Sequence, residues 1–471
     1  MDLPALLAAQ RAAFTAELPV GIAIRKDRLK RAIAMIADNA DAFCDALSED
    51  FGHRSREQSM ITDIAASIAP LRHALKHVDR WSRAEKRPVM FPLGLLGARG
   101  RVEYQPKGVV GVISPWNFPV NLVMGPLAGI FAAGNRAMVK TSEFTPRVAA
   151  LFEQVAPQHF ASDELVFVSG GADVGQAFAA LPFDHLIFTG ATGIGRHILH
   201  AAADNLTPVT LELGGKSPVI LGRSADVTTA AGRVAMGKML NAGQICLAPD
   251  YMLVPAEQEG AVVDALVASA SAMYPTLLAN PDYTAIINDR HHQRLNDWLD
   301  DARAKGAELV TVNPANEDFA ASNSRKMPLT IVRGATDDMT VMQEEIFGPI
   351  LPLRRYDALD DAIAEVNRRD RPLGLYYFGT DAAERRRVLD RTISGGVTLD
   401  DVVFHVSMEE LPFGGIGPSG MGAYHGHDGF RTFSHARAIF QQSRLDVARL
   451  AGLKPPYGAA TRKAIARQMK G

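Results

Sequence analysis

The sequence predicts an α/β protein with two sheet-containing lobes, and three observations support this fold class. Short apolar segments alternate with helical segments between Gly108 and Asn205, as in a parallel sheet with crossover helices. A second alternating region follows Gly214 and Gly215. Before both regions, the first 85 or so residues carry apolar side chains at helical spacing, which predicts a helical layer.

The expected strands of the first lobe are 109–113, 136–140, 165–168, 185–188 and 209–213. A sheet of this kind is Rossmann-like and commonly binds a dinucleotide at the carboxyl ends of its strands. The second lobe is expected to have strands at 218–221 and 251–254 and around 309, 329 and 351, with helices at 225–240 and 260–273, and to continue to 395–397. Near Pro88, glycines and the alternation of Val102 and Tyr104 with polar residues predict a small arm or hairpin.

Composition excludes several classes of function. Lysine and arginine (50) nearly balance aspartate and glutamate (52). A net charge of −2 produces no long-range electrostatic field that would attract nucleic acid or an anionic membrane. Only two cysteines are present, too few for a disulfide framework, so we expect a reducing compartment. The first residues include no basic leader, which favours a cytoplasmic location.

An uncharged stretch at 109–135 is long enough to raise the question of a membrane span. Pro115, Pro119 and Pro126 lie within it, and each proline removes a backbone donor that lipid cannot replace. We therefore expect no stable membrane anchor.

The glycine-rich segment from Phe188 to Gly195 follows an expected strand and opens an expected helix. Its glycines would let backbone amides approach a pyrophosphate at the start of that helix. The segment also resembles the short-chain dehydrogenase fingerprint, but no tyrosine has the required lysine four residues later. Alone it is a weak signal, because such a turn can simply pack a helix on a sheet.

Cys246 is expected in a bend between a helix and the strand that starts at Tyr251. A lone cysteine is usually a small buried apolar residue, and Cys44, within an amphipathic helical segment, keeps that interpretation. Glu212 alternates with apolar residues, as a surface strand residue would, and Asn117 could be a simple turn residue. Together, however, a thiol, an amide donor and a carboxylate base are what thiol-dependent oxidation of an aldehyde requires.

The chain resembles the aldehyde dehydrogenase family over nearly its whole length. The motifs that carry this resemblance are Pro115-Trp-Asn-Phe-Pro119, Lys140-Thr-Ser-Glu143, Phe188 to Gly195, Leu211-Glu-Leu-Gly-Gly-Lys216, Gly243-Gln-Ile-Cys246, Glu345-Ile-Phe-Gly-Pro349 and Pro412-Phe-Gly-Gly415. The segment 244–251, Tyr424-His-Gly and Thr432-Phe-Ser-His435 resemble the class 3 branch. Thr141 and Ala191 stand where the family commonly has proline and serine, which leaves the choice between NAD and NADP open.

The resemblance implies the aldehyde dehydrogenase fold, with Cys246 as the nucleophile and Glu212 as the base for deacylation. Asn117 and the Cys246 amide would form the oxyanion hole. The expected cofactor contacts are Trp116, with no part of the cofactor assigned to it, Lys140 and Glu143 at the adenosine ribose, Gly190 and Gly195 by the pyrophosphate, and Glu345 and Phe347 at the nicotinamide. In the class 3 branch Glu345 could share the base role.

The resemblance also implies a division of labour along the chain. Residues 1–86, 108–212 and 403–435 would form the NAD(P)-binding domain, and 213–402 the catalytic domain. Residues 87–107 and 436–450 would form an oligomerisation arm, followed by a basic tail at 451–471. We expect a homodimer that uses NAD, with NADP possible, on an aromatic aldehyde such as coniferyl aldehyde or on a medium-chain aliphatic one.

Three alternatives share some of these residues. A cysteine hydrolase would need no nicotinamide, but it would leave Gly190 to Gly195 and Glu345 without a task, and omission of the cofactor from the assay would separate the two. A catalytically silent scaffold and an acylating reductase are disfavoured by the presence of Asn117, Glu212 and Cys246 together. We expect no metal site, since the two neighbouring histidines His425 and His427 do not by themselves make up a metal ligand set.

Overall fold

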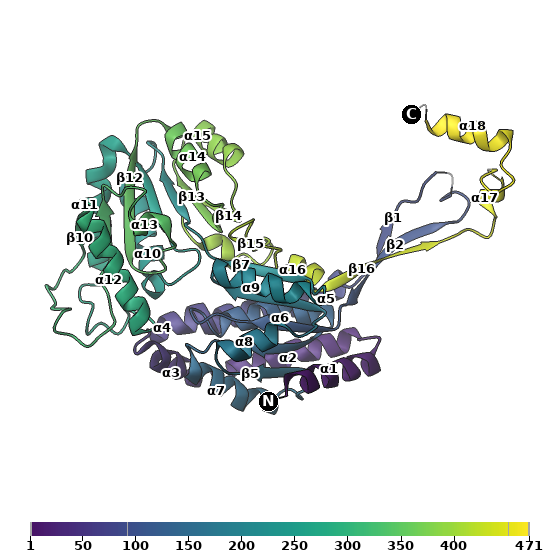
Figure 1. Ribbon diagram of the computed structural model, residues 1–471, viewed down its shortest axis with the longest axis horizontal. Helices are drawn as coiled ribbons and strands as arrows, with labels where there is room; N and C mark the ends of the chain where they lie inside the picture. Colours follow the sequence, from purple (N-terminus) through teal and green to yellow (C-terminus); the bar gives the residue numbers. More distant parts are fainter. Residues whose placement is uncertain (1, 92, 451, 470–471) are drawn as a thin grey trace.

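A computed structural model describes residues 2–91, 93–450 and 452–469 as three sheets with helices packed around two of them (Figure 1). Residue 92 of the predicted arm and residues 451, 470 and 471 of the predicted tail lie outside this description. The predicted α/β class is confirmed.

The first sheet has six strands in the order β15-β7-β6-β3-β4-β5. Its strands are β3 (Val109–Ile113), β4 (Arg136–Lys140), β5 (Leu165–Val168), β6 (His185–Gly190), β7 (Val209–Leu213) and β15 (Gly420–Met421). Neighbours from β7 to β5 are parallel, and only the short β15 is antiparallel to β7. The continuous apolar character of these strands has a physical cause, because helices cover a parallel sheet on both faces.

The helices of this lobe are α1 (Leu3–Glu17), α2 (Ile22–Ala37), α3 (Ala40–Phe51), α4 (Arg56–Ser59), the π-helix η1 (Met60–Ala65), α5 (Ala66–Trp81), α6 (Asn121–Ala133), α7 (Pro146–Val155), η2 (Ala156–Gln158), α8 (Ala172–Ala179), α9 (Thr192–Ala203) and α16 (Gly426–Thr432). Helix α6 explains the long uncharged stretch, since every residue from Val123 to Ala133 is buried between α5, α2 and α16. Among the described residues, none of the helices combines the length and apolar character needed to cross a bilayer.

The second sheet has seven strands in the order β10-β11-β12-β9-β8-β13-β14. The strands are β8 (Pro218–Leu221), β9 (Tyr251–Pro255), β10 (Glu308–Thr311), β11 (Thr330–Arg333), β12 (Ile350–Tyr356), β13 (Gly374–Phe378) and β14 (Gly396–Leu399). The remaining helices of this region are α10 (Val227–Met239), η3 (Leu240–Gly243), η4 (Ala256–Gln258), α11 (Glu259–Met273), α12 (Asp289–Ala304), α13 (Thr340–Gln343), α14 (Leu359–Arg368), α15 (Ala382–Arg391) and η5 (Phe404–Ser407). The second lobe predicted from the sequence is thus present as a sheet with its own apolar core.

A three-stranded antiparallel sheet, in the order β1-β2-β16, projects away from both lobes (Figure 1). It consists of β1 (Glu85–Arg87), β2 (Arg99–Pro106) and β16 (Ser434–Gln441), and it leads to α17 (Val447–Leu450) and α18 (Ala459–Gln468). The two outer strands begin at Glu85 and Ser434, each two residues before the corresponding predicted arm limit of 87 or 436. The functional division of the chain stays a prediction, since sheets alone do not assign a task to a lobe.

Candidate active site

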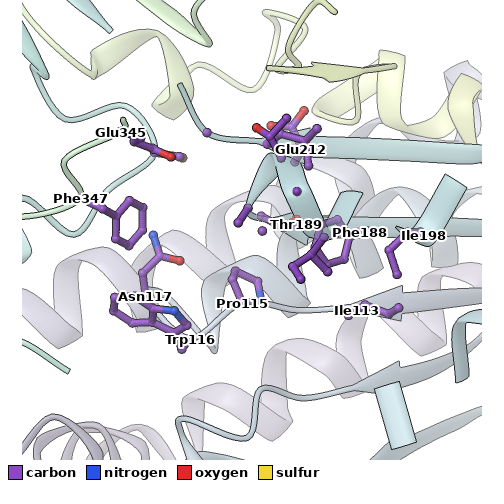
Figure 2. Close-up of a pocket in the computed structure, with 18 of the residues that line it drawn as sticks. Ile113, Pro115, Trp116, Asn117, Phe188, Thr189, Ile198, Glu212, Glu345 and Phe347 are labelled. Carbon is purple, nitrogen blue, oxygen red and sulfur yellow. The ribbon is translucent and has the colours of Figure 1, made fainter. Parts of the chain in front are cut away.

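A cavity of about 1390 Å³ opens at the carboxyl ends of the first sheet and is closed on its other side by residues of the second lobe. The crevice outside the carboxyl ends of parallel strands is the usual ligand site of such sheets. The predicted site residues that line this cavity are Trp116, Asn117, Lys140, Glu143, Gly190, Glu212, Cys246, Glu345 and Phe347. In Figure 2 the labelled members of this set face the same space from different elements.

Gly195 does not line this cavity and borders a smaller pocket beside it. A Cβ atom at Gly195 would lie 2.8 Å from Leu213 Cδ2, closer than packed carbon atoms can approach. This glycine therefore lets α9 pack against β7. At Gly195, the glycine-rich segment thus packs a helix on a sheet, which was one of the two interpretations that its sequence allowed.

Cys246 lies in the loop between η3 and β9, where it is partly exposed although both of its neighbours are buried. The loop begins with an unusual turn, because Asn241 and Ala242 each have a φ of 51° and Gly243 has a φ of 74°. Positive φ is costly for residues with a side chain and persists only where the surroundings hold it. The turn directs Cys246 toward the cavity.

Buried hydrogen bonds hold this turn in place. Gln58 accepts a hydrogen bond from the Asn241 amide (2.9 Å) and donates one to Asn241 Oδ1 (3.3 Å). Asn241 Nδ2 donates in turn to the carbonyl oxygens of Asn117 (3.2 Å) and Gln244 (3.2 Å). Helix α4 is thereby connected to both the Cys246 loop and the Asn117 loop.

Asn117 is held from two sides. Its Nδ2 donates to the Gln244 carbonyl (3.1 Å), which places the carboxamide against the Cys246 loop, and its own carbonyl accepts from Arg54 Nη1 (2.9 Å). Arg54 pairs with Asp63 (2.6 Å), and both of these side chains are fully buried. Asp63 also accepts from the amides of Val120 (3.1 Å) and Asn121 (3.2 Å), so the whole loop is fixed before α6 begins.

Two carboxyl groups approach the thiol. Glu212, near the end of β7, is 3% exposed, and within the described residues its Oε1 has no hydrogen-bond partner. Burial raises the pKa of Glu212 well above its usual range. Burial likewise raises the pKa of Glu345 to about 8, with the nearby Asp250 carboxylate adding to the effect. Each carboxyl group is thus set to exchange a proton.

The Cys246 thiol responds to the same environment. Burial raises the pKa of Cys246, the carboxylates of Glu212 and then Glu345 raise it further, and the backbone amides of Cys246 and Leu247 oppose the shift. In the state described, the sulfur is therefore a thiol, and it needs a base or a nearby positive charge to become the reactive thiolate.

Trp116 and Phe347 form an aromatic wall, with their ring centroids 5.2 Å apart and their planes at 74°. Phe347 has a φ of 48°, a second strained position in the cavity lining. The carboxylate of Glu345 lies over Gly214, where a Cβ atom would collide with it. This contact explains why glycine follows the end of β7.

Lys140, the last residue of β4, and Glu143, three residues later, line the same cavity. Lys140 is 3% exposed, its Nζ donates to the Thr141 carbonyl (2.7 Å), and it lies 3.9 Å from the Glu143 carboxylate. Burial lowers the pKa of Lys140. A buried amine beside a partly exposed carboxylate can bind two neighbouring hydroxyl groups, which is what a ribose presents.

Sequence analysis missed a set of cations around the same cavity. They are Arg196, Arg290, Arg294, Arg368, Arg369 and Arg371. They come from α9, α12 and the segment at the end of α14, so no spacing along the chain could have indicated them. Clustered cations at a cleft attract anionic groups such as phosphates.

Comparisons with known proteins agree with this geometry. A family model described as "Aldehyde dehydrogenase family" matches residues 2–439. A protein of Caulobacter vibrioides named "Probable coniferyl aldehyde dehydrogenase" is 55% identical over 466 residues, covering 99% of this chain and 96% of that protein. A rat protein named "Aldehyde dehydrogenase, dimeric NADP-preferring" is 36% identical, covering 95% of this chain and 96% of its own.

A solved structure titled "Substrate bound state of Staphylococcus Aureus AldH" superimposes with a TM-score of 0.90 at 35% identity, and the match covers 99% of each chain. The family resemblance expected from the sequence is confirmed. Within the family, the chain is similar to proteins named as coniferyl aldehyde dehydrogenases.

Proposed function

The chain belongs to the aldehyde dehydrogenase family, and we propose that Cys246 is the nucleophile in its reaction. NAD(P)-dependent oxidation of an aldehyde to a carboxylic acid is its activity. One observation supports the assignment of roles above all others: Cys246, Asn117 and Glu212 reach the same cavity as Lys140 and Glu143, although they come from separate parts of the chain.

In the proposed first step, Cys246 Sγ passes its proton to a neighbouring carboxylate, Glu345 or Glu212, and forms a bond to the aldehyde carbon. The carbonyl oxygen becomes negative and is held by Asn117 Nδ2 and the Cys246 amide. Asn117 Nδ2 carries two hydrogens and donates one of them to Gln244, so the second is free for this oxygen. Oxidised NAD(P), when bound, would supply the hydride acceptor; loss of hydride lets the carbonyl double bond re-form, and the carbon is left as a thioester of Cys246.

In the proposed second step, a water molecule attacks the thioester while Glu212 takes up its proton. The C–S bond then breaks, the sulfur leaves as a thiolate and the carboxylic acid is released. The free Oε1 of Glu212 supports this role, because a base must have an unoccupied lone pair within reach of water. Glu345 is near enough to raise the thiol pKa, so a shared base role for the two carboxyl groups remains part of the proposal.

The cavity has the chemistry that a dinucleotide requires. Space is open beside Gly193 in the first turn of α9, where a Cβ atom would meet nothing within 4 Å, and the start of a helix favours phosphate. We propose that Lys140 and Glu143 hold the adenosine ribose, Gly190 adjoins the pyrophosphate, and Trp116, Glu345 and Phe347 border the nicotinamide end.

Removal of the sulfur tests the proposal directly. Cys246→Ala should abolish turnover while NADH binding, followed by its fluorescence, survives. The matched control is Cys44→Ala, which changes the other cysteine, in a buried part of α3, and should keep its turnover. Dehydrogenase activity in the Cys246→Ala variant would refute the assigned role.

We propose NAD as the preferred cofactor. Glu143 is 45% exposed on its side chain, and a carboxylate that bonds the ribose 2′-hydroxyl would repel a 2′-phosphate. Glu143→Gln should therefore lower the ratio of kcat/KM for NAD over NADP. An unchanged ratio would remove Glu143 from cofactor discrimination.

We propose an aromatic aldehyde, coniferyl aldehyde being the model, as the substrate, with medium-chain aliphatic aldehydes as the alternative. Trp116, Leu122 and Phe413 line the cavity and belong to the same apolar cluster as Cys246, a surface suited to an aromatic ring. The name of the Caulobacter relative supports the same choice. Phe413→Ala should raise KM more for coniferyl aldehyde than for hexanal, and an equal change would favour the aliphatic alternative.

We propose that the chain is a cytoplasmic homodimer. The projecting arm leaves Met90, Phe91 and Leu95 exposed by 67%, 80% and 80%, which a second copy could cover. The proposed cofactor domain is 1–86, 108–212 and 403–435, with the catalytic domain at 213–402. Light scattering during gel filtration measures the molar mass and so tests whether the protein is a dimer. Imaging of a fluorescent fusion in the producing cell tests the cytoplasmic location.

A further inference from the structure

Three side chains with metal-binding atoms gather at a point that the proposed reaction does not use. His73 and His77 lie one helical turn apart on α5, and Glu410 follows η5. His73 Nε2 is 3.0 Å from Glu410 Oε1, and one ligand atom from each of the three residues lies within 4.8 Å of the other two. The imidazole ring centroids are 4.5 Å apart.

We propose that His73, His77 and Glu410 bind a divalent transition metal ion, with Zn²⁺ as the best match. Two imidazole nitrogens and one carboxylate oxygen are a common zinc ligand set, with water as the fourth ligand. Histidines four residues apart on one helix face present their nitrogens to a single ion. Magnesium and calcium, which prefer oxygen ligands, are poor candidates.

The observed spacing needs only a small contraction. Ligand atoms about 2.0 to 2.2 Å from zinc lie closer together than 4.8 Å, so the triad must close slightly around an ion. Glu410 can provide that movement, because its side chain is 63% exposed, whereas His73 is held at 16% exposure. Trp81 stacks on His77 with centroids 5.8 Å apart and so orients one ligand ring.

The surrounding charges set the expected strength of binding. Burial lowers the pKa of His73, and His77, Lys76 and Arg80 add to this while Glu410 opposes it. A lowered pKa keeps the imidazole neutral at pH 7, which is the form that binds metal. The positive charges of Lys76 and Arg80 also repel a cation, so we expect moderate rather than very tight affinity.

An ion at this point would tie α5 to the segment that leads to the cavity. Glu410 lies three residues before Phe413, which lines the cavity, and Val403 and Val406 of the same segment pack against the core that contains Cys246. His73 also lies close to Gly426 at the start of α16. Bound metal should therefore raise the melting temperature of the protein.

The test uses the full chain in a Cys246→Ser background, so that the active-site thiol cannot take the metal. Zn²⁺ affinity is measured at pH 7.5 by competition with a chromogenic chelator, and Co²⁺ is added separately to record the visible absorption of a tetrahedral site. His73→Ala and His77→Ala should each weaken Zn²⁺ binding by about 10-fold or more, since loss of an orienting partner alone costs about 10- to 100-fold. Glu410→Gln should weaken it less.

The matched control is His200→Ala, which removes an exposed histidine on α9 and should leave Zn²⁺ affinity unchanged. Equal affinity in the His73, His77 and His200 variants would overturn the proposal, as would the absence of Zn²⁺ binding in the Cys246→Ser protein. Neither result would bear on the proposed role of Cys246, because that role is tested by turnover. This proposal departs from the expectation of no metal site, which weighed only His425 and His427.

Discussion

The buried ion pair between Arg54 and Asp63 makes a quantitative prediction about stability. Arg54→Met should lower the free energy of unfolding by about 3–5 kcal/mol, because it leaves a buried carboxylate without its partner. Methionine keeps the packing of the aliphatic part of the side chain, but it has no counterpart to the guanidinium carbon, which lies 4.8 Å from the Phe51 ring centroid and 5.1 Å from that of Phe118. The loss therefore combines the unpaired charge of Asp63 with the lost contacts of the guanidinium group, and its pH dependence identifies the part that comes from charge.

The loss should also depend on pH, with a definite sign. Burial raises the pKa of Asp63 even with Arg54 in place, and removal of the guanidinium raises it further. A carboxyl group whose pKa is higher in the folded than in the unfolded protein destabilises the fold above the unfolded pKa of about 3.9, and the deficit grows by about 1.4 kcal/mol per pH unit. It stops growing when the pH passes the folded pKa. The deficit of Arg54→Met should thus be smaller at pH 5 than at pH 8.

Urea unfolding at pH 5 and pH 8, followed by tryptophan fluorescence, measures the loss of unfolding free energy in Arg54→Met. Arg56→Met is the matched control, since the Arg56 side chain is 49% exposed in its ion pairs and its loss should cost no more than about 1 kcal/mol. Adding Asp63→Asn to Arg54→Met should restore most of the stability, because the amide oxygen still accepts from Val120 and Asn121. A deficit no larger than that of the control, or one that is larger at pH 5, would refute the reasoning.

Three further changes test the site. Glu212→Gln should give a fast first-turnover burst of NADH followed by slow turnover, and stopped-flow traces without a burst would show a role before deacylation. Glu345→Gln should lower the pKa of Cys246, because a repelling carboxylate is lost, and the pH dependence of iodoacetamide alkylation would detect it; an unmoved or raised profile would contradict this. Gly195→Ala should destabilise the fold by about 1–3 kcal/mol, because its Cβ would lie 2.8 Å from Leu213 Cδ2. If it instead raised KM for NAD without loss of stability, Gly195 would be a cofactor contact.

Sequence reasoning found the residues whose local surroundings are unusual. Cys246 follows a glycine-containing bend, Asn117 lies between two prolines, and Glu212 precedes two glycines. Strands that are buried on both faces must be apolar throughout, and so the strands of both lobes could also be located. These signals are local, and the structure brings the three residues to one cavity.

The residues that hold the site could not be found in this way. Arg54 reaches Asn117 across 63 positions, and Gln58 reaches Asn241 across 183. A buried arginine and a buried glutamine on an amphipathic segment look like surface residues until the fold supplies their partners. The same applies to His73 and Glu410, which only the packing of α5 against the later segment brings together.

In the strained turn before Cys246, the stability of the fold and the orientation of the sulfur favour different residues. Glycine at position 242 would adopt the φ of 51° without steric cost, so Ala242→Gly would relax the folded chain locally. The same substitution would also let the loop adopt other conformations, and Cys246 Sγ would be oriented toward the aldehyde carbon for a smaller fraction of the time. Selection for a higher free energy of unfolding would therefore favour substitutions in this turn that selection for a higher turnover rate would reject.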